Sequence, residues 1–315
     1  MKKISVAMAT YNGAKYIIQQ LESIRLQTYP PDEVVICDDG STDLTVELVS
    51  DYIASNSLNG KWKIIKNDKN LGFVNNFIHS ILQTTGDIIC LSDQDDIFLE
   101  NKFETIYRFL DEHEDCLLVN TGFDNIDSSG NIISNIRSHR ASLNDTTYYK
   151  LDFNRWLFES SFPGFAMAFT STLRDQLYTF RDVNFYGHDQ LISLIALKLG
   201  GNYKLETKLS HYRVHDNNTS GGNTIVKNYT LDSRVKQKEK ELAEYKMLKQ
   251  YLVDNKFNNE EVAYLNLRME ELSERIKCLK NSNLWKMVLF LIYSKYYPKK
   301  TILGDLYYIL KSFLA

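Results

Sequence analysis

Short apolar runs alternate with amphipathic stretches along the first half of the chain. The apolar runs lie at residues 4–9, 34–37, 63–66, 87–91 and 117–121, and stretches with helical spacing lie at 14–27, 43–54, 73–83 and 102–112. This alternation is typical of strands and crossover helices in a parallel sheet that is covered on both faces. The pattern predicts an α/β domain with a mostly parallel, Rossmann-like central sheet flanked by helices.

The pattern becomes less regular after a predicted turn at residues 127–131. A helix with loops is expected over 138–160, a buried strand over 164–170, a helix over 189–199 and a further strand over 203–206. The run Gly221-Gly222-Asn223 is typical of a linker. We therefore predict that the first domain covers residues 1–225.

A helical hairpin is predicted at 226–282, with long charged helices over 232–255 and 259–280. In its second helix, apolar residues recur at alternating spacings of three and four, at Val262, Leu265, Met269, Leu272, Ile276 and Leu279. This seam is short, which favours packing against the first domain over a free coiled coil.

The last segment, 283–315, combines lysines with many aromatic and aliphatic residues. It contains five lysines and a single acid, Asp305, which leaves a local excess of four positive charges. Such a helical tail suits peripheral contact with an anionic membrane surface. A pair of helices that bury their apolar face against the hairpin is an equally good interpretation.

Composition and charge narrow the class of protein. Of the 315 residues, 43% are hydrophobic and 24% are charged, and the net charge is -3. No overall basic field is present to collect phosphates, which argues against a nucleic-acid partner. The four cysteines lack metal-type spacing, and no apolar run reaches the roughly 18 residues that a membrane span needs. We expect reduced thiols and a cytoplasmic location, at the inner face of the plasma membrane if the tail binds lipid.

The strongest chemical signal is a cluster of carboxylates directly after the apolar run 87–91. Asp93, Asp95 and Asp96 lie within four positions, and a second acidic turn follows the run 34–37. Carboxylates this close repel one another, and a divalent cation is the simplest way to keep them ionised at neutral pH. A solvated turn in which Asp95 or Asp96 caps the next helix is the ordinary alternative.

Four motifs, taken in order, resemble the signature of family 2 glycosyltransferases with the GT-A fold. They are Ala9-Thr10-Tyr11-Asn12, Asp38-Asp39-Gly40-Ser41-Thr42-Asp43, Asn70-Leu71-Gly72 and Asp93-Gln94-Asp95-Asp96, and the resemblance covers residues 1–220. With His188-Asp189-Gln190 and Tyr212-Arg213-Val214-His215, the set is similar to bacterial enzymes that add rhamnose or similar sugars to cell-wall and capsular polysaccharides.

The resemblance implies an inverting, metal-dependent transfer of a sugar from a UDP or dTDP donor to a saccharide acceptor that is lipid-linked. Rhamnose is favoured, ahead of glucose, galactose and N-acetylhexosamines. A nucleotidyltransferase would need a glycine-rich phosphate loop near the N-terminus, which the sequence lacks. The alternative of another class is an inactive saccharide-binding scaffold subunit.

The resemblance also implies residues for the donor site. The nucleotide-sugar would be bound by Thr10, Tyr11, Asn12, Asp38, Asp39, Asn70, Gly72, Asp93, Gly164 and Arg213. Asp38 would accept the N3 proton of a uracil or thymine ring, and Asp39 would hold the turn. Gly164 would let the substrate approach the backbone closely. Arg213 would either pair with the diphosphate or form a structural salt bridge.

For the cation, Mn²⁺ or Mg²⁺, the resemblance implies Asp95 and His215 as ligands. Asp93 would contact the metal shell or the donor ribose, and Asp96 would lie behind the ligands or cap a helix. Asp189 would be the general base that takes the proton of the acceptor hydroxyl, after a histidine in place of the more common glutamate. A helix cap is the competing interpretation of Asp189.

Overall fold

The computed structural model describes residues 1–133, 146–159, 162–177, 187–215, 218 and 230–313. The chain divides into two compact units, the first made of Met1–Asp152 and Ser161–Thr219 and the second of Phe153–Ser160 and Ser220–Ala315. The hairpin and the tail are two separate segments in the prediction from sequence. The structure places both in the second unit and adds residues 153–160 to it. The predicted linker at 221–223 lies outside the described residues.

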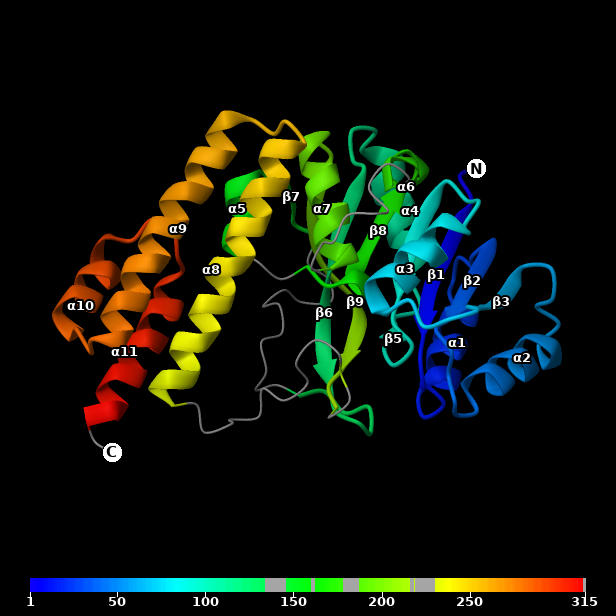
Figure 1. The fold of residues 1–315 in the computed structure, drawn as a ribbon. Helices are drawn as coiled ribbons and strands as arrows, with labels where there is room; N and C mark the ends of the chain where they lie inside the picture. The colour runs from blue at the N-terminus through cyan, green and yellow to red at the C-terminus, as the bar shows by residue number, and fades with distance from the viewer. Residues whose placement is uncertain (134–145, 160–161, 178–186, 216–217, 219–229, 314–315) are drawn as a thin grey trace. The chain divides into compact units, whose positions relative to one another are not determined.

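The first unit is built on one mixed sheet of nine strands (Figure 1). Their order is β3-β2-β1-β4-β8-β6-β9-β5, and β7 pairs with β9. Strands β1 to β4 pair in parallel, whereas β8 runs antiparallel to both of its neighbours. The bounds are Ile4–Thr10 (β1), Glu33–Asp38 (β2), Trp62–Lys66 (β3), Ile88–Ser92 (β4), Ile97–Phe98 (β5), Leu118–Ile126 (β6), Tyr148–Lys150 (β7), Met167–Thr170 (β8) and Asn202–Arg213 (β9).

Helices cover both faces of this sheet. Side chains alternate across a strand, and Ile4, Val6 and Met8 of β1 pack with one set of helices, α1, α2 and α4. Helix α3 contacts β1 and β2 without joining that cluster, and it also contacts α6 and α7. The bounds are Ile17–Arg25 (α1), Thr45–Ser55 (α2), Phe73–Leu82 (α3), Lys102–Glu112 (α4), Ser171–Leu177 (α6) and His188–Lys198 (α7).

The predicted α/β pattern of the first half is confirmed, and its boundaries shift where turns intervene. Helix α1 begins at Ile17 rather than at residue 14, after a turn in which Asn12 has a φ of 49°. Gly164–Ala166 form a short 3₁₀ turn, so the expected strand starts at Met167. Strand β9 continues to Arg213, well beyond the predicted 203–206, because it pairs with β6 along most of its length.

The second unit is helical. Its helices are α5 (Phe153–Glu159), α8 (Leu231–Asp254), α9 (Asn259–Lys280), α10 (Leu284–Tyr293) and α11 (Lys299–Phe313). The predicted hairpin is confirmed as α8 and α9, and a capping box of Asn258 and Glu261 starts α9. Residues Leu272, Ile276 and Leu279 of the predicted seam lie in the core of this unit, together with residues of α10 and α11.

The sequence also predicts reduced cysteines and no segment long and apolar enough to span a membrane. All four cysteines are free and buried. Among the residues that the structure describes, no helix combines the length and the apolar character needed to cross a bilayer.

Candidate active site at the carboxyl ends of the strands

The predicted motifs meet at one edge of the sheet. Thr10 at the end of β1 pairs in register with Asp38 at the end of β2, and Met8 pairs with Ser92 at the end of β4. From β1 the chain adds β2 and β3 on one side of the sheet and β4 on the other, so successive connections change direction at β1. Open α/β sheets bind ligands at such a switch point, beyond the carboxyl ends of the strands.

Both oxygens of the Asp38 carboxylate accept hydrogen bonds from the turn that follows β2 or from the end of β1. Oδ1 accepts hydrogen bonds from the backbone N–H groups of Gly40 and Ser41, and Oδ2 accepts from the hydroxyls of Ser41 and Thr10, the last at 2.9 Å. The side chain is buried. Asp38 therefore fixes the turn and joins β1 to β2, which is the work expected of Asp39.

Asp39 organises the neighbouring loop instead. Its Oδ1 accepts from Leu71 N–H and from the Asn67 side chain, and its Oδ2 accepts from Gly72 N–H at 2.9 Å. Asn70 donates to the backbone carbonyl of Asp39, and Gly72 has a φ of 79°. The Asn70 and Gly72 motif is thus held to the end of β2 by the second acid of the pair.

Tyr11 and Asn12 join this edge to the acidic cluster. The N–H of Asn12 donates to Ser41, and its side-chain oxygen accepts from Thr42 N–H. Gln94 accepts from the N–H of Tyr11 and donates to its carbonyl, both at 3.0 Å. A Cβ at Gly13 would lie 2.1 Å from the Gln94 side-chain oxygen, so a larger residue here would displace the Gln94 amide from its present position. Gln94 is part of the acidic motif in the sequence, which predicted no role for it.

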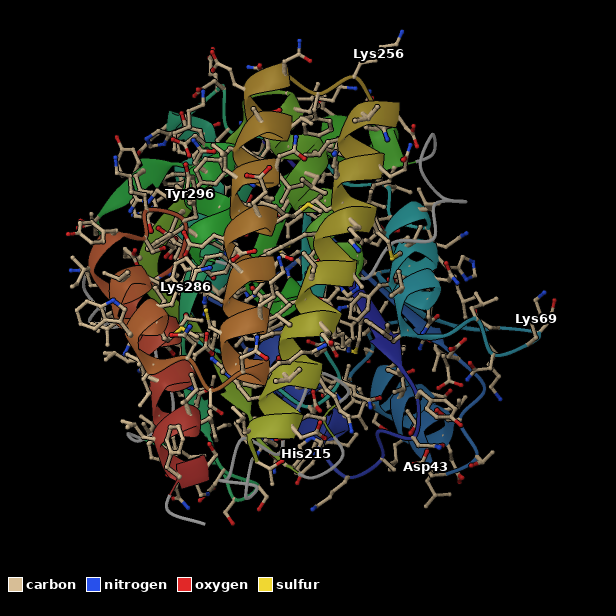
Figure 2. All side chains as sticks on the ribbon, turned by 60° about the vertical axis from the view of Figure 1, so that its left-hand side comes forward. Asp43, Lys69, His215, Lys256, Lys286 and Tyr296 are labelled. Atoms are coloured by element: carbon tan, nitrogen blue, oxygen red, sulfur yellow. The ribbon has the colours of Figure 1, made fainter. Side chains whose placement is uncertain are left out.

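Asp95 and His215 come together from positions far apart in the sequence. Nε2 of His215 lies 2.8 Å from Oδ2 of Asp95, and both side chains are largely buried. Figure 2 labels His215, which follows the end of β9. The ring of His215 also lies against Tyr16, with 5.1 Å between ring centroids.

Asp93 lies at the centre of the negative charge. Burial, together with the nearby carboxylates of Asp95 and Asp189, raises its pKa to about 8. Asp189 is at the amino end of α7, so the acids of β4 and of α7 share one electrostatic environment. Asp93, Asp95, Asp189 and His215 therefore belong to one site.

Asp96 is fully buried behind this group, and it does not cap a helix. Helix α4 begins six residues later, after β5, with Asn101 at the N-cap. One oxygen of Asp96 accepts from Arg213 N–H, and the other has no partner among the described residues. Burial and the neighbouring Asp95 and Asp93 raise its pKa well above the ordinary value.

Arg213 supports the cluster from inside the protein. Its guanidinium is fully buried, lies over the ring of Tyr16 and donates to the carbonyls of Asp95, Asp127 and Ser128 and to the side chain of Gln19. Of the two interpretations of Arg213, this geometry favours the structural one, because its donors are directed at protein acceptors and away from solvent.

Lys102 is a buried cation that sequence reasoning missed. Its Nζ donates to the carbonyl of Phe165 at 2.6 Å and to Ser210 at 2.8 Å, and it lies 3.6 Å from the centre of the Phe98 ring. Burial lowers its pKa to about 7, although Asp96 and Asp93 act in the opposite direction. A lysine in the first turn of an amphipathic helix looks like a surface residue, so the sequence carries no signal of this position.

Gly164 lies against His188, which immediately precedes Asp189. A Cβ on Gly164 would lie 2.6 Å from Nε2 of His188. The histidine ring is buried, stacks on Phe77 at 4.0 Å between centroids, and has no hydrogen-bond partner among the described residues. The group that approaches Gly164 closely in this structure is thus His188, and the approach of a substrate stays a prediction.

Asp189 itself is partly exposed at the amino end of α7. The N-cap of this helix is Gly187, which makes no side-chain capping bond, while Oδ1 of Asp189 accepts from Gln190 N–H at 2.8 Å. The carboxylate is therefore oriented by the first turn of the helix, and its charge acts on Asp93.

The chemistry of the site suits a divalent cation. Asp95 and His215 place an oxygen and a nitrogen donor side by side, and Asp93 and Asp96 add negative charge that a cation would offset. Within the described residues no three such side chains form a metal-binding group. Mg²⁺ and Mn²⁺ in phosphate-transferring sites commonly use one or two protein ligands together with substrate phosphates, so the pair fits that role.

Comparison with known proteins identifies the family. The sequence pattern described as Glycosyl transferase family 2 matches residues 5–172, which is more than half of the chain. The chain belongs to glycosyltransferase family 2. The match ends before α7 and β9. It covers the ends of β1, β2 and β4 and the acidic cluster that follows β4.

Curated relatives agree with this assignment. EpsE of Bacillus subtilis, named as a glycosyltransferase, is 34% identical over 120 residues, which cover 38% of this chain and 42% of EpsE. The glycosyltransferase GlyG of Streptococcus pneumoniae is 29% identical over 41% of this chain and 42% of GlyG. The poly(ribitol-phosphate) beta-N-acetylglucosaminyltransferase TarS of Staphylococcus aureus is 36% identical over 38% of this chain and 21% of TarS. The matches thus span less than half of each of these relatives.

Solved structures with the same fold cover nearly the whole chain. A fragment of S. aureus TarS in complex with UDP-GlcNAc aligns over 99% of this chain and 91% of that one, with a TM-score of 0.58 and 18% identity. The mannosyltransferase PcManGT of Pyrobaculum calidifontis, in complex with GDP-Man and Mn²⁺, aligns over 99% and 86%, with a TM-score of 0.62 and 16% identity. The predicted GT-A fold is confirmed.

Proposed function

We propose that the chain transfers a sugar from a UDP or dTDP donor to a saccharide acceptor in the assembly of a cell-surface polysaccharide, with inversion at the anomeric carbon. The observation that carries this proposal is the convergence of Asp93, Asp95, Asp189 and His215 beside the switch point of the sheet. A scaffold subunit would have no use for acids held close enough to repel one another.

The donor's nucleotide is assigned to the turn at the end of β2. Asp38 already receives four hydrogen bonds, whereas Oδ2 of Asp39 receives one from Gly72, so Asp39 has the freer acceptor for the N3 proton of a uracil or thymine ring. Thr10, Tyr11, Asn12 and Asn70 border the same edge. Complexes of related folds with UDP-GlcNAc and with GDP-Man support a nucleotide-sugar donor.

The transferred sugar is the finer part of the proposal. The acidic motif favours rhamnose, while the TarS relatives make N-acetylglucosamine a direct competitor, with glucose and galactose behind. We propose a lipid-linked saccharide as acceptor, at the cytosolic face of a membrane.

Asp189 is assigned as the general base. Its Oδ1 accepts from Gln190 N–H, and its charge acts on Asp93 of the acidic cluster, which supports this assignment. The acceptor hydroxyl gives its proton to Asp189 while its oxygen attacks the anomeric carbon, and the bond between that carbon and the diphosphate oxygen breaks. A positioned base of this type contributes about 10²- to 10⁴-fold in rate.

Asp95 and His215 are the residues that would hold Mn²⁺ or Mg²⁺, with Asp93 beside them. The cation, when bound, supplies positive charge for the diphosphate. Arg213 and Lys102 support the site through buried hydrogen bonds. Arg213 holds the backbone carbonyl of Asp95, and Lys102 joins the turn at Phe165 to Ser210 of β9.

A panel of nucleotide sugars tests this proposal. Thermal stability of the full chain is measured with UDP-GlcNAc, UDP-glucose, UDP-galactose, dTDP-rhamnose and GDP-mannose, each with and without Mn²⁺. A donor present at 100 times its Kd stabilises a protein by about 2.7 kcal/mol, which is easily detected. We expect stabilisation by a uridine or thymidine donor that depends on Mn²⁺ and on Asp95. Stabilisation by none of these donors would refute the proposal.

A further inference from the structure

Helices α10 and α11 each bury one apolar face inside the second unit. Met287 of α10 and Ile302, Leu306 and Ile309 of α11 lie in the core with residues of α8 and α9. The tail is therefore an integral part of this unit, as one of the two interpretations of the sequence requires. Removal of the tail would uncover the core, so a deletion cannot report on a surface role.

Both helices carry a second apolar face that is exposed. On α10, Trp285 is 73% exposed, and Leu289, Ile292 and Tyr293 follow at helical spacing of four, seven and eight residues. On α11, Tyr307 and Leu310 follow Leu303 by four and seven residues, and Phe313 comes three residues later. The two helices contact one another and bury their opposite sides in the same core, so both stripes face outward from it. Soluble proteins rarely leave so many large apolar side chains together in water.

The exposed charged residues within the segment 283–313 all have one sign, that of lysine. Lys295, Lys299, Lys300 and Lys311 are exposed, and the structure records no acidic partner for them among the described residues. Lys286, labelled on α10 in Figure 2, pairs with Glu274 of α9. The only acid of the segment, Asp305, is fully buried between Arg234 and Arg275. The outer side of α10 and α11 is thus apolar and cationic.

We propose that the outer side of α10 and α11, defined by these two stripes and the four lysines, docks on the surface of an anionic lipid bilayer. Aliphatic and aromatic side chains enter the headgroup region, and long lysine side chains at the margins reach the lipid phosphates. Helices of 10 and 15 residues are about 15 and 22 Å long, shorter than a hydrocarbon core of about 30 Å, so they lie on the bilayer and do not cross it.

A bilayer fits this surface better than a second copy of the chain. In a symmetric dimer the same patch would meet itself, and unpaired lysines would face lysines. An anionic bilayer brings apolar depth and negative charge at once. The surface also explains how an enzyme with the proposed lipid-linked acceptor would reach its substrate, but the evidence for docking is independent of that proposal.

Vesicle flotation of the full chain tests the proposal. We expect the protein to float with phosphatidylglycerol-rich vesicles and to stay behind with pure phosphatidylcholine vesicles. Trp62 and Trp156 are 5% and 7% exposed, so Trp285 is the one water-exposed tryptophan of the three in the chain. Its fluorescence should shift to the blue and lose quenching by iodide when the anionic vesicles are added.

Matched variants separate the contributions. Lys299→Ala with Lys300→Ala should lower the partition coefficient by about fivefold for each lysine. The control, Lys236→Ala with Lys240→Ala, removes two exposed lysines of α8 that pair with Asp232 and Glu244, and it should leave partitioning unchanged. Ile292→Ser with Leu310→Ser should weaken binding, whereas Leu267→Ser on α9 should not.

Several outcomes would overturn the proposal. These are absence of flotation with anionic vesicles, equal flotation with both lipids, equal loss in the control variants, or a dimer in solution that shields Trp285 without lipid. Donor-induced thermal stabilisation, measured on the same variants, should be unchanged. A failure of donor binding would refute the proposed function and leave the flotation result standing.

Discussion

The two units of the chain treat buried charge in opposite ways. In the helical unit, Asp305 is fully buried and receives the guanidinium groups of both Arg234 and Arg275. In the sheet unit, Asp93 and Asp96 are crowded beside further carboxylates, and their pKa values are raised. Lys102, a buried cation that acts on both of these acids, makes its hydrogen bonds to Phe165 and Ser210 rather than to a carboxylate.

This difference separates a structural ion network from a ligand site. Charges that pair within the fold stabilise it, and they need nothing from outside. Carboxylates that are held together without a counterion are tolerated where a ligand supplies the missing positive charge, and perturbed pKa values cluster at such sites. Replacement of an acid should therefore have opposite consequences in the two units.

The largest effect is expected on catalysis. Asp189→Asn keeps the shape of the side chain but removes its basicity, so the transfer rate should fall about 10²- to 10⁴-fold while donor-induced thermal stabilisation is kept. Asp175→Asn, on the exposed surface of α6, is the matched control and should retain activity. Full activity of Asp189→Asn would remove this residue as the base.

The next effect is on the stability of the helical unit. Asp305→Asn leaves two guanidinium groups without their carboxylate, one of them fully buried, and should lower the free energy of unfolding by about 3–5 kcal/mol in denaturant titrations. Asp232→Asn breaks an exposed ion pair with Lys236 and should cost no more than about 1 kcal/mol. Equal effects of the two substitutions would contradict the assignment of Asp305 to a structural network.

A smaller loss is expected for Lys102→Met. The substitution leaves the carbonyl of Phe165 and the hydroxyl of Ser210 without a donor, which should cost about 1–3 kcal/mol in the same titrations. It also removes positive charge that lowers the pKa values of Asp93 and Asp96. A double-mutant cycle with Asp93→Asn should show a coupling between the two positions, and strict additivity would place Lys102 outside the site.

The smallest effect, taken per pH unit, is a change in the pH dependence of stability. The pKa of Asp93 is raised from 3.8 to about 8, so the folded state binds a proton that the unfolded state releases between these values. The stability contributed by this group is complete below pH 3.8 and is lost as the pH rises toward 8. Relative to Asp93→Asn, the wild type should therefore lose up to about 1.4 kcal/mol of unfolding free energy per pH unit in this window.

Added Mn²⁺ sharpens that measurement. A cation binds the ionised carboxylates, so it should flatten the pH dependence of the wild type and leave Asp93→Asn less affected. A wild-type chain whose stability does not fall with pH, or falls as steeply in Asp93→Asn, would show that the acids of the sheet unit are as well compensated as Asp305.

The sequence predicted the early strands and helices well because their pattern is local. Buried strands such as β1, β2 and β4 are near-continuous apolar runs, and the acids at their ends were placed correctly at one edge. The hairpin of α8 and α9 was visible from its seam and its turn. Strand β9 was underestimated, because pairing with β6 extends it through polar residues that carry no strand signal.

Individual roles in the site were harder to predict. The sequence does not distinguish Asp38 from Asp39, and only the hydrogen bonds show that Asp38 is used by its own turn. Gly164 was correctly singled out as a point of close approach, but the group that approaches is the His188 ring. Lys102 and Gln94 carry no pattern at all, since their partners lie more than 60 residues away along the chain.

By itself, the sequence determined the class of fold, the family, and the set of acids that meet at the sheet edge. These features depend on periodicity and on short motifs, which are properties of neighbouring residues. Only the tertiary structure decided which charges are paired and which are left for a ligand, and that the tail both packs inward and exposes an apolar face. The physical reason is that burial and pairing depend on contacts between distant segments, and burial is what turns a charged or apolar side chain into a stabilising or a binding group.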